Sequence, residues 1–284
     1  MDGQLGRLIG KGGACEVYEY DAGKVVKLYF EGYGKYDVQR EYDKTLQVWK
    51  QNLPVPEPVA VINLNGRYGL VMERIEGESL LDRLVNHILK TGEEDISVEA
   101  LVRCPETFEH ARMAAYLLSR IHSVTVDGFP DFLEGLQWAA SHNAYLTDQE
   151  KARVLDRIDR LPKENCLCHG DPNPGNMIMN SGKITLIDWV NSGIGSPMCD
   201  LAEFILMFRY PVLPSDTPRR IMEFLQVHAE GIIKVFLEEY RRLTRRDVSS
   251  VEDWMVPMMV SKLWATAIPH ELKVRIAEDL RGRL

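Results

Sequence analysis

The chain has 284 residues, 45% of them hydrophobic and 27% charged, a balance typical of a folded globular protein and not of a disordered one. Its net charge is −8, and binding to phosphate backbones needs a basic surface, so we expect no nucleic-acid partner. No apolar run approaches the roughly 20 residues of a membrane helix. The start of the chain also lacks the apolar core of a signal peptide, so we expect a cytoplasmic protein without membrane contact.

The first 75 residues predict an antiparallel sheet with one main helix. Short β-forming runs between glycines indicate strands at 8–9, 16–20 and 24–29. From residue 35 the period becomes helical, with one apolar stripe that ends before Pro54; the stripe consists of Val38, Tyr42, Leu46 and Trp49. Strands at 59–64 and 67–75 follow, joined by Asn65 and Gly66, a pair typical of tight hairpins.

Residues 76–284 predict a larger and mainly helical domain, which we separate from a first domain at residues 1–75. Helical patterns occur at 108–122, 148–160, 219–243, 253–267 and 270–280. In the first of these helices one face is apolar apart from His122, which we interpret as a core residue with satisfied hydrogen bonds.

One β-like interruption lies inside this helical part. Residues 177–180 and 183–187 predict two strands of similar length around a Ser181-Gly182 turn. Because such a hairpin folds back on itself, Asn176 before the first strand and Asp188 after the second should lie side by side. An amide oxygen and a carboxylate are suitable ligands for Mg²⁺, so we predict a metal site at this corner.

A glycine-rich segment lies between the first two predicted strands. Gly10, Gly12 and Gly13 leave room for backbone N–H groups to approach phosphate oxygens. The segment fits the kinase pattern G-x-G-x-x-G-x-V, except that Cys15 replaces the third glycine. It does not fit the P-loop, because no Gly-Lys-Ser/Thr closes it.

The next strand carries Lys27, and Glu41 follows 14 residues later on the predicted helix. A lysine that binds phosphates benefits from a carboxylate that fixes its flexible stem. We therefore predict that these two residues act together, although a solvated lysine and a surface glutamate are the ordinary alternatives for each residue alone.

The most specific motifs lie between residues 169 and 202. They are His-Gly-Asp-x-x-x-x-Asn at 169–176, Ile-Asp-Trp at 187–189 and Gly-Ser-Pro-Met-Cys-Asp-Leu-Ala at 195–202. Together with the end of the helix near His122, they resemble the aminoglycoside phosphotransferase and choline kinase-like family. The resemblance covers nearly the whole chain in the order of its motifs.

The resemblance implies an α+β fold with two lobes, like that of protein kinases, and an ATP-dependent kinase of small molecules. Asp171 would be the catalytic aspartate that orients the acceptor hydroxyl and receives its proton. The remaining implied roles are Mg²⁺ coordination by Asn176 and Asp188, phosphate binding by Lys27 with Glu41 behind it, adenine recognition by the hinge Met72, Glu73 and Ile75, and support of the catalytic loop by Asp200. We interpret His169, which follows an apolar strand, as a packed support of the same loop.

Two other functions stay open at this point, namely a nucleotide-binding regulator without catalysis and an atypical protein kinase. Asp200 follows Asp188 by only 12 positions, which leaves little room for a peptide platform and favours a small acceptor. Residues 1–74 are electrically balanced, so the whole acidic excess follows them and mildly favours a neutral or cationic acceptor. Acceptor-side candidates rest only on their position in the second part, and they are Glu203, Asp216, Trp254 and Glu271.

The pair Cys166 and Cys168 lacks a matching Cys/His pair, so we expect buried core cysteines instead of a metal site.

Overall fold

The computed structural model describes residues 5–90, 105–213, 217–266 and 268–284. These residues form two compact units. The first unit consists of the described residues up to Glu78 together with Ile178–Asn191, and the second consists of Ser79–Met177 and Ser192–Leu284. The predicted division of the chain into two domains at residue 75 stays a prediction.

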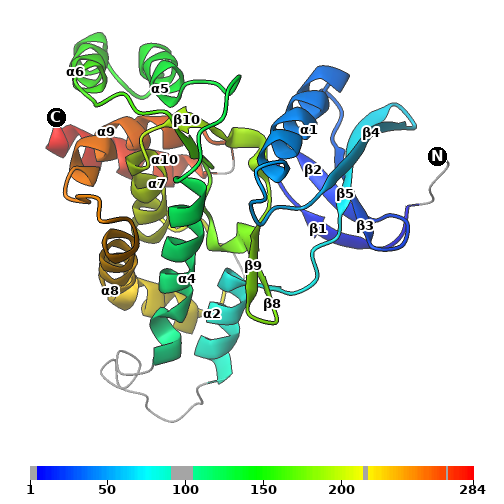
Figure 1. Cartoon of the computed structure of the whole chain (residues 1–284). Helices are drawn as coiled ribbons and strands as arrows, with labels where there is room; N and C mark the ends of the chain where they lie inside the picture. The colour runs from blue at the N-terminus through cyan, green and yellow to red at the C-terminus, as the bar shows by residue number, and fades with distance from the viewer. Residues whose placement is uncertain (1–4, 91–104, 214–216, 267) are drawn as a thin grey trace. The chain divides into compact units, whose positions relative to one another are not determined.

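The first unit is built on a five-stranded antiparallel sheet in the order β1-β2-β3-β5-β4 (Figure 1). Its strands are β1 (Leu8–Lys11), β2 (Cys15–Glu19), β3 (Lys24–Tyr29), β4 (Pro58–Leu64) and β5 (Arg67–Glu73). The β4–β5 turn places Asn65 and Gly66 at φ of 51° and 89°, as a tight hairpin requires. Both the sheet and this hairpin agree with the sequence prediction.

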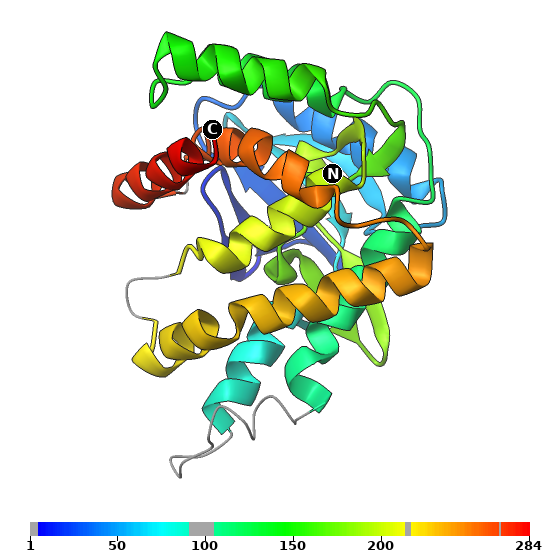
Figure 2. The same cartoon turned by 90° about the vertical axis from the view of Figure 1, so that its left-hand side faces the viewer.

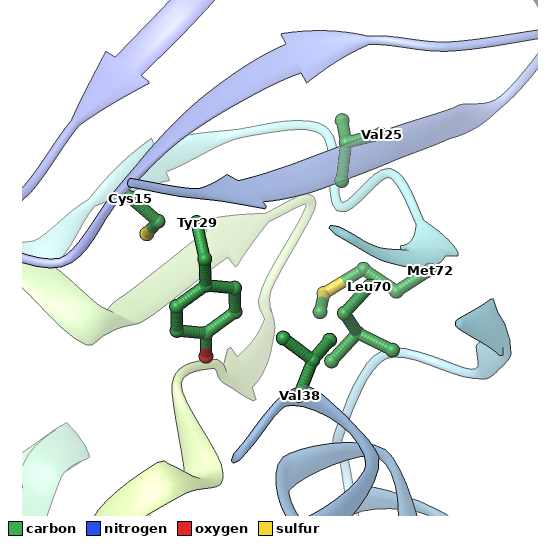
Figure 3. Packing of buried hydrophobic residues seen from close by; sticks show 6 residues of the cluster. All are labelled: Cys15, Val25, Tyr29, Val38, Leu70 and Met72. Atoms are coloured by element: carbon green, nitrogen blue, oxygen red, sulfur yellow. The ribbon is translucent and has the colours of Figure 1, made fainter. Parts of the chain in front are cut away.

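Helix α1 (Lys35–Trp49) packs on β4 and β5 and covers one face of the sheet. Because side chains alternate along a strand, β3 and β5 bury one set of residues on each face. Figure 3 shows the cluster on the face of α1, where the α1 residue Val38 packs against sheet residues; the cluster consists of Cys15, Val25, Tyr29, Val38, Leu70 and Met72. A second cluster forms from the alternate positions Val26 of β3 and Val71 of β5, together with Tyr20, which follows β2.

The buried face of α1 differs from the predicted apolar stripe. Its buried residues are Val38, Glu41, Lys44, Thr45 and Val48, whereas the side chain of Trp49 is exposed. The predicted stripe is confirmed for Val38, which is buried, and for Tyr42, which packs against the same cluster. It was wrong for Trp49, and it did not include Glu41 and Lys44, because hydrophobic periodicity cannot detect charged side chains that are buried through ion pairs and hydrogen bonds.

The second unit is mainly helical. Its helices are α2 (Leu80–Lys90), α4 (Pro105–Ile121), α5 (Phe132–Ser141), α6 (Asp148–Asp159), α7 (Met198–Arg209), α8 (Arg219–Thr244), α9 (Val251–Lys262) and α10 (His270–Arg283). Helix α7 is buried along most of its length and packs against α8 and α9, while α8 also packs against α4 (Figure 2). None of the helices in the described parts of the chain combines the length and the apolar composition of a membrane span.

Small β elements accompany the helices and lead into the site. Strands β7 (Cys166–Cys168) and β10 (Gly193–Gly195) pair antiparallel. Strands β8 (Met177–Asn180) and β9 (Lys183–Leu186) form the predicted hairpin, and the short β6 (Glu78–Ser79) lies next to β8 in the same sheet. Single turns of 3₁₀ helix, η1 (Pro174–Asn176) and η2 (Trp189–Asn191), flank this hairpin.

Several helix predictions need correction. Helix α9 ends at Lys262 and not near residue 267, because the chain closes two successive turns at Trp264 and Ala265. Helices α2, α5 and α7 had no predicted counterpart among these ranges. For α7 the reason is that it is buried on nearly all sides and therefore shows no amphipathic period. The fold class itself, an antiparallel sheet followed by a larger helical part, is as predicted.

Candidate active site

Lys27 lies on β3 between Val25 and Tyr29, on the face of the sheet that α1 covers. Its ammonium Nζ lies 2.8 Å from Glu41 Oε1 and 2.7 Å from Asp188 Oδ1. All three residues belong to the first unit. The structure therefore joins the lysine of β3, the glutamate of α1 and the aspartate after β9 into one ion-paired cluster.

Burial and charge act in opposite directions on this cluster. Burial by itself lowers the pKa of Lys27, but the carboxylates of Glu41 and Asp188 outweigh it and hold that pKa above its ordinary value. Burial raises the pKa of Glu41 against the effect of Lys27. Glu41 Oε2 is buried without a hydrogen-bond partner. Lys27 is thus a cation held at a fixed position, and Glu41 depends on it for its charge compensation.

Asp188 follows β9 in an unusual backbone conformation. Its φ is 68°, in the left-handed region that costs a non-glycine residue about 1 kcal/mol or more. Its side chain is 36% exposed, so the carboxylate is accessible from solvent although Lys27 contacts it. Such strain at an accessible carboxylate is a reason to suspect a functional role.

The glycine-rich turn connects β1 and β2. A Cβ atom added at Gly13 would meet no atom within 4 Å, and one added at Gly12 would make only an ordinary contact with the Cys15 carbonyl. Packing therefore does not require glycine at these positions. Cys15, at the position of the third glycine of the pattern, is buried beside Tyr29, and this burial raises the pKa of its thiol to about 11.

The predicted hinge lies at the end of β5. Met72 is buried in the core of the first unit. The N–H groups of Glu73 and Arg74 donate to the carbonyls of Glu57 and Gly23 at 2.8 and 2.9 Å. Since these donors are used within the unit, recognition of an adenine edge would depend on the N–H of Ile75.

In the second unit, the loop after β7 is held by Asp200 at the start of α7. The Asp200 carboxylate accepts hydrogen bonds from the backbone N–H groups of His169 and Gly170, both at 2.7 Å. Gly170 has a φ of 80°, a conformation that glycine adopts without strain. His169 is fully buried, and its Nδ1 accepts a hydrogen bond from the Asp171 N–H.

His122, which directly follows α4, supports Asp200 and connects it to Tyr240 of α8. His122 Nε2 lies 3.0 Å from Asp200 Oδ2, and Nδ1 lies 2.8 Å from the Tyr240 hydroxyl. Burial disfavours the Asp200 carboxylate, but the hydrogen bonds from His122 and from the His169 backbone outweigh it and hold its pKa below the ordinary value. The interpretation of His122 as a core residue with satisfied hydrogen bonds is confirmed.

Asp171 is half-buried and is oriented by the turn that follows it. Its carboxylate Oδ2 and its carbonyl both accept from Asn176 Nδ2 at 3.2 Å, and its carbonyl also accepts from the Asn173 N–H. Asn173 caps η1 through its side chain, which accepts from the Gly175 N–H. Because Asn176 directs its amide nitrogen toward Asp171, its Oδ1 remains as an oxygen ligand of the kind that Mg²⁺ prefers.

Asn176 belongs to the second unit and Asp188 to the first. Their predicted pairing around a metal ion therefore stays a prediction. Within its own unit each residue has a clear partner, which is Asp171 for Asn176 and Lys27 for Asp188.

A second group of potential metal ligands, His122, Cys168 and Asp200, is buried in the second unit with its donor atoms within 4.8 Å of one another. Burial keeps the pKa of the Cys168 thiol well above its ordinary value, so the sulfur is protonated. Both nitrogens of His122 and both oxygens of Asp200 already make hydrogen bonds. This group is a support of the loop, and Cys166 and Cys168 are buried core residues, as predicted.

The three acceptor-side candidates that the structure describes lie in different surroundings. Glu203 is neutralised by Lys262 at 2.5 Å, and Trp254 is fully buried. Glu271 is exposed at the start of α10, and Asp216 lies outside the described residues.

Tyr240, which binds His122, was not predicted from the sequence. A tyrosine on an amphipathic helix gives no signal that distinguishes a hydrogen-bonded core position from simple packing.

A family model described as the phosphotransferase enzyme family matches residues 8–228. No curated protein sequence matches the chain. Among solved structures, a Haemophilus somnus protein assigned as a fructosamine-3-kinase has a TM-score of 0.59 at 13% identity, with 98% of this chain and 92% of that chain covered.

Two further structures extend the comparison. The ternary complex of the aminoglycoside phosphotransferase APH(2")-IIa with streptomycin and ATP has a TM-score of 0.51 at 17% identity and covers 98% of this chain and 91% of that one. The macrolide 2'-phosphotransferase MphH of Brachybacterium faecium has a TM-score of 0.54 at 14% identity, with coverages of 97% and 91%. At these identities the likeness concerns the fold.

Proposed function

We propose that this chain, which belongs to the phosphotransferase enzyme family, transfers the γ-phosphate of ATP to a hydroxyl group of a small molecule. The observation that carries the proposal is the pairing of Lys27 with both Glu41 and Asp188. Phosphoryl transfer requires charges at fixed positions and little covalent chemistry from the protein. A fixed cation beside an accessible carboxylate meets this requirement.

On the donor side, Lys27 would bind the α- and β-phosphates while Glu41 holds its stem. Backbone N–H groups of Gly10, Gly12 and Gly13 would approach other phosphate oxygens, which agrees with the absence of a packing reason for glycine at 12 and 13. The adenine base would lie against the hinge of Met72, Glu73 and Ile75.

Asn176 and Asp188 fit the requirements of a Mg²⁺ site in the nature of their atoms. Asn176 offers Oδ1, and Asp188 offers an accessible carboxylate. The bound ion would neutralise charge on the phosphate oxygens during transfer. The Asp188 carboxylate also pairs with the Lys27 ammonium.

Asp171 would act on the acceptor. Its carboxylate would accept a hydrogen bond from the acceptor hydroxyl and take its proton as the new oxygen–phosphorus bond forms and the bond to ADP breaks. Asn176 fixes the orientation of this carboxylate. Asp200 and His169 would keep the loop in place without touching the reacting atoms.

Two alternative functions receive less support. A silent nucleotide-binding regulator would have no need for Asp171, Asn176, Asp188 and Lys27 together, and the chain has all four. A protein kinase would need a segment that recognises a peptide between Asp188 and Asp200, but this stretch contains only η2, β10 and the start of α7.

The acceptor class that we propose is a hydroxyl compound of aminoglycoside, amino-alcohol or sugar type. The acidic excess after residue 74 favours a neutral or cationic molecule. Glu203 does not contribute a free charge to such a site, because Lys262 neutralises it. Solved structures of similar fold are named for streptomycin, fructosamine and macrolide chemistry, so the fold itself does not select among acceptors.

The proposal is tested by measuring ATP consumption in the presence of Mg²⁺ over a panel of hydroxyl-bearing metabolites and antibiotics. The blank is Asp171→Asn, which keeps the size of the side chain, and the control is Asp127→Asn at an exposed position. We expect turnover with one acceptor class, a loss of at least about a hundredfold in Asp171→Asn, and no change in Asp127→Asn. Turnover that survives in Asp171→Asn would refute the assigned role.

A further inference from the structure

Lys44 is a buried lysine on α1, with 6% of its surface exposed. Its ammonium donates a hydrogen bond to the backbone carbonyl of Val190 in η2 at 2.8 Å. Burial lowers its pKa to about 8, with a further contribution from the charge of Arg40. Lysines are seldom buried, because desolvation of the ammonium costs free energy, so its position calls for an explanation.

The contacts of Lys44 belong to a closed ring of interactions within the first unit. Lys44 follows Glu41 by one turn of α1, and Glu41 binds Lys27, which in turn binds Asp188. Val190 lies two residues after Asp188 and binds Lys44. Helix α1 is therefore connected to the segment around Asp188 at two points, indirectly to the Asp188 side chain through Lys27 of β3, and directly to the Val190 carbonyl through Lys44.

The segment around Asp188 needs such restraint. Asp188 has a strained φ of 68°. On its upstream side, the Leu186 N–H donates to the Pro54 carbonyl at 2.9 Å. The hydrogen bond from Trp189 Nε1 to the Leu186 carbonyl, also at 2.9 Å, joins the residues on the two sides of Asp188. Lys44 supplies the corresponding restraint on the downstream side.

We infer that Lys44 is a positioning residue of the phosphotransfer site, which fixes η2 to α1 and thereby holds the Asp188 carboxylate in the orientation that a metal–nucleotide complex requires. The inference rests on the proposed function. A hydrogen bond from a charged donor is stronger than one between neutral groups, which gives a reason for a lysine at this buried position. If Lys44 served the stability of the fold alone, its replacement would change ATP binding equally with and without Mg²⁺.

The test compares nucleotide binding with and without the metal. Calorimetric titration with ATP in Mg²⁺ and in EDTA is done for the wild type, Lys44→Met and Lys44→Arg, with Lys35→Met as the matched control at an exposed position of the same helix. We expect Lys44→Met to bind ATP about tenfold more weakly in Mg²⁺ and within about twofold of the wild type in EDTA. Lys44→Arg should recover part of the loss, and Lys35→Met should match the wild type.

The outcomes separate this inference from the proposed function. A wild type that binds no ATP in Mg²⁺ would overturn both. If the wild type binds ATP and Lys44→Met shows the same magnesium dependence of binding, the inference alone would be overturned. An equal loss of ATP affinity in Mg²⁺ and in EDTA would overturn it as well. Thermal unfolding monitors the fold of each variant, and Lys44→Gln, which keeps a polar side chain, carries the same comparison if Lys44→Met does not fold.

Discussion

His122 Nε2 lies 3.0 Å from Asp200 Oδ2, and both side chains are buried. The same carboxylate accepts the N–H groups of His169 and Gly170, so one buried charge orders the backbone that precedes Asp171. Helices α4 and α7 thus determine the conformation of the loop although neither contributes the proposed catalytic residue.

The first prediction concerns Asp200→Asn. The side-chain amide of the asparagine would place its NH₂ group against donors, namely the backbone N–H groups or the imidazole that bind the Asp200 carboxylate. At least one of these buried donors would therefore lose its acceptor. We expect a loss of about 2–3 kcal/mol in the free energy of unfolding, measured in urea at neutral pH. The matched substitution Asp127→Asn, at an exposed site, should change it by less than about 0.5 kcal/mol. Equal stability of the two variants would contradict the support role.

The sequence predicts much of this arrangement, and the reasons are local. The strands, the tight turns and the amphipathic helix α4 follow from periods and turn residues that neighbouring positions specify. The pairing of Lys27 with Glu41 was predictable, because the order of the motifs indicated a lysine on a strand followed by a glutamate on a helix. The support of the loop was harder to predict, since His122, Asp200 and Tyr240 come from three segments far apart in sequence, and only tertiary packing brings them together.

Lys44 illustrates a second limit. In the sequence it belongs to the polar side of an apolar stripe, and nothing distinguishes it from a solvated lysine. Its burial depends on the backbone of η2, which is 146 residues away. Every residue has a backbone carbonyl, so the residue type at position 190 does not show that its carbonyl accepts a hydrogen bond from a distant side chain. Sequence patterns therefore cannot indicate such an interaction.

The second prediction concerns the pH dependence of stability through His110. This histidine of α4 is buried with an unpartnered Nε2, and burial, with a contribution from His87, lowers its pKa to about 4. Its unfolded pKa is about 6.5, so between these values the unfolded chain binds more protons than the folded one. Stability should therefore be complete above about pH 7 and fall as the pH decreases toward 4.

The comparison of wild type with His110→Leu isolates this effect. In urea unfolding between pH 7 and pH 4.5, the wild type should lose about 2–3 kcal/mol relative to His110→Leu. His142→Leu, which removes an exposed histidine, should keep the pH dependence of the wild type. Parallel pH profiles for wild type and His110→Leu would show that His110 does not titrate with a lowered pKa.

The third prediction concerns Cys15, the departure from the glycine-rich pattern. Its side chain fills space beside Tyr29 and Val38 in the first unit. Cys15→Gly would restore the pattern but leave a cavity and a more flexible backbone, so we expect a loss of about 1–3 kcal/mol in unfolding free energy. ATP affinity should not improve. The native thiol should also react slowly with a thiol reagent, because burial raises its pKa to about 11.

The last prediction separates the stabilising role of the Lys27–Glu41 pair from its proposed function. Lys27→Met would remove the cation that pairs with the buried Glu41 carboxylate, and breaking a buried ion pair in this way costs about 3–5 kcal/mol. In the double variant Lys27→Met, Glu41→Leu, the buried carboxylate of Glu41 is gone, and the carboxylate that has lost its cation is that of Asp188, whose side chain is 36% exposed. Because apolar replacements of buried pairs are often neutral, most of the stability should return.

Binding should behave differently from stability in these variants. Neither the single nor the double variant can offer a cation to the phosphates, so both should lose ATP affinity to a similar extent in calorimetric titrations. Glu41→Gln retains Lys27 and should lose less, since it releases the lysine stem without removing the charge. If the double variant regained ATP affinity along with its stability, Lys27 would be a structural lysine, and the assignment of this cluster to phosphate binding would be wrong.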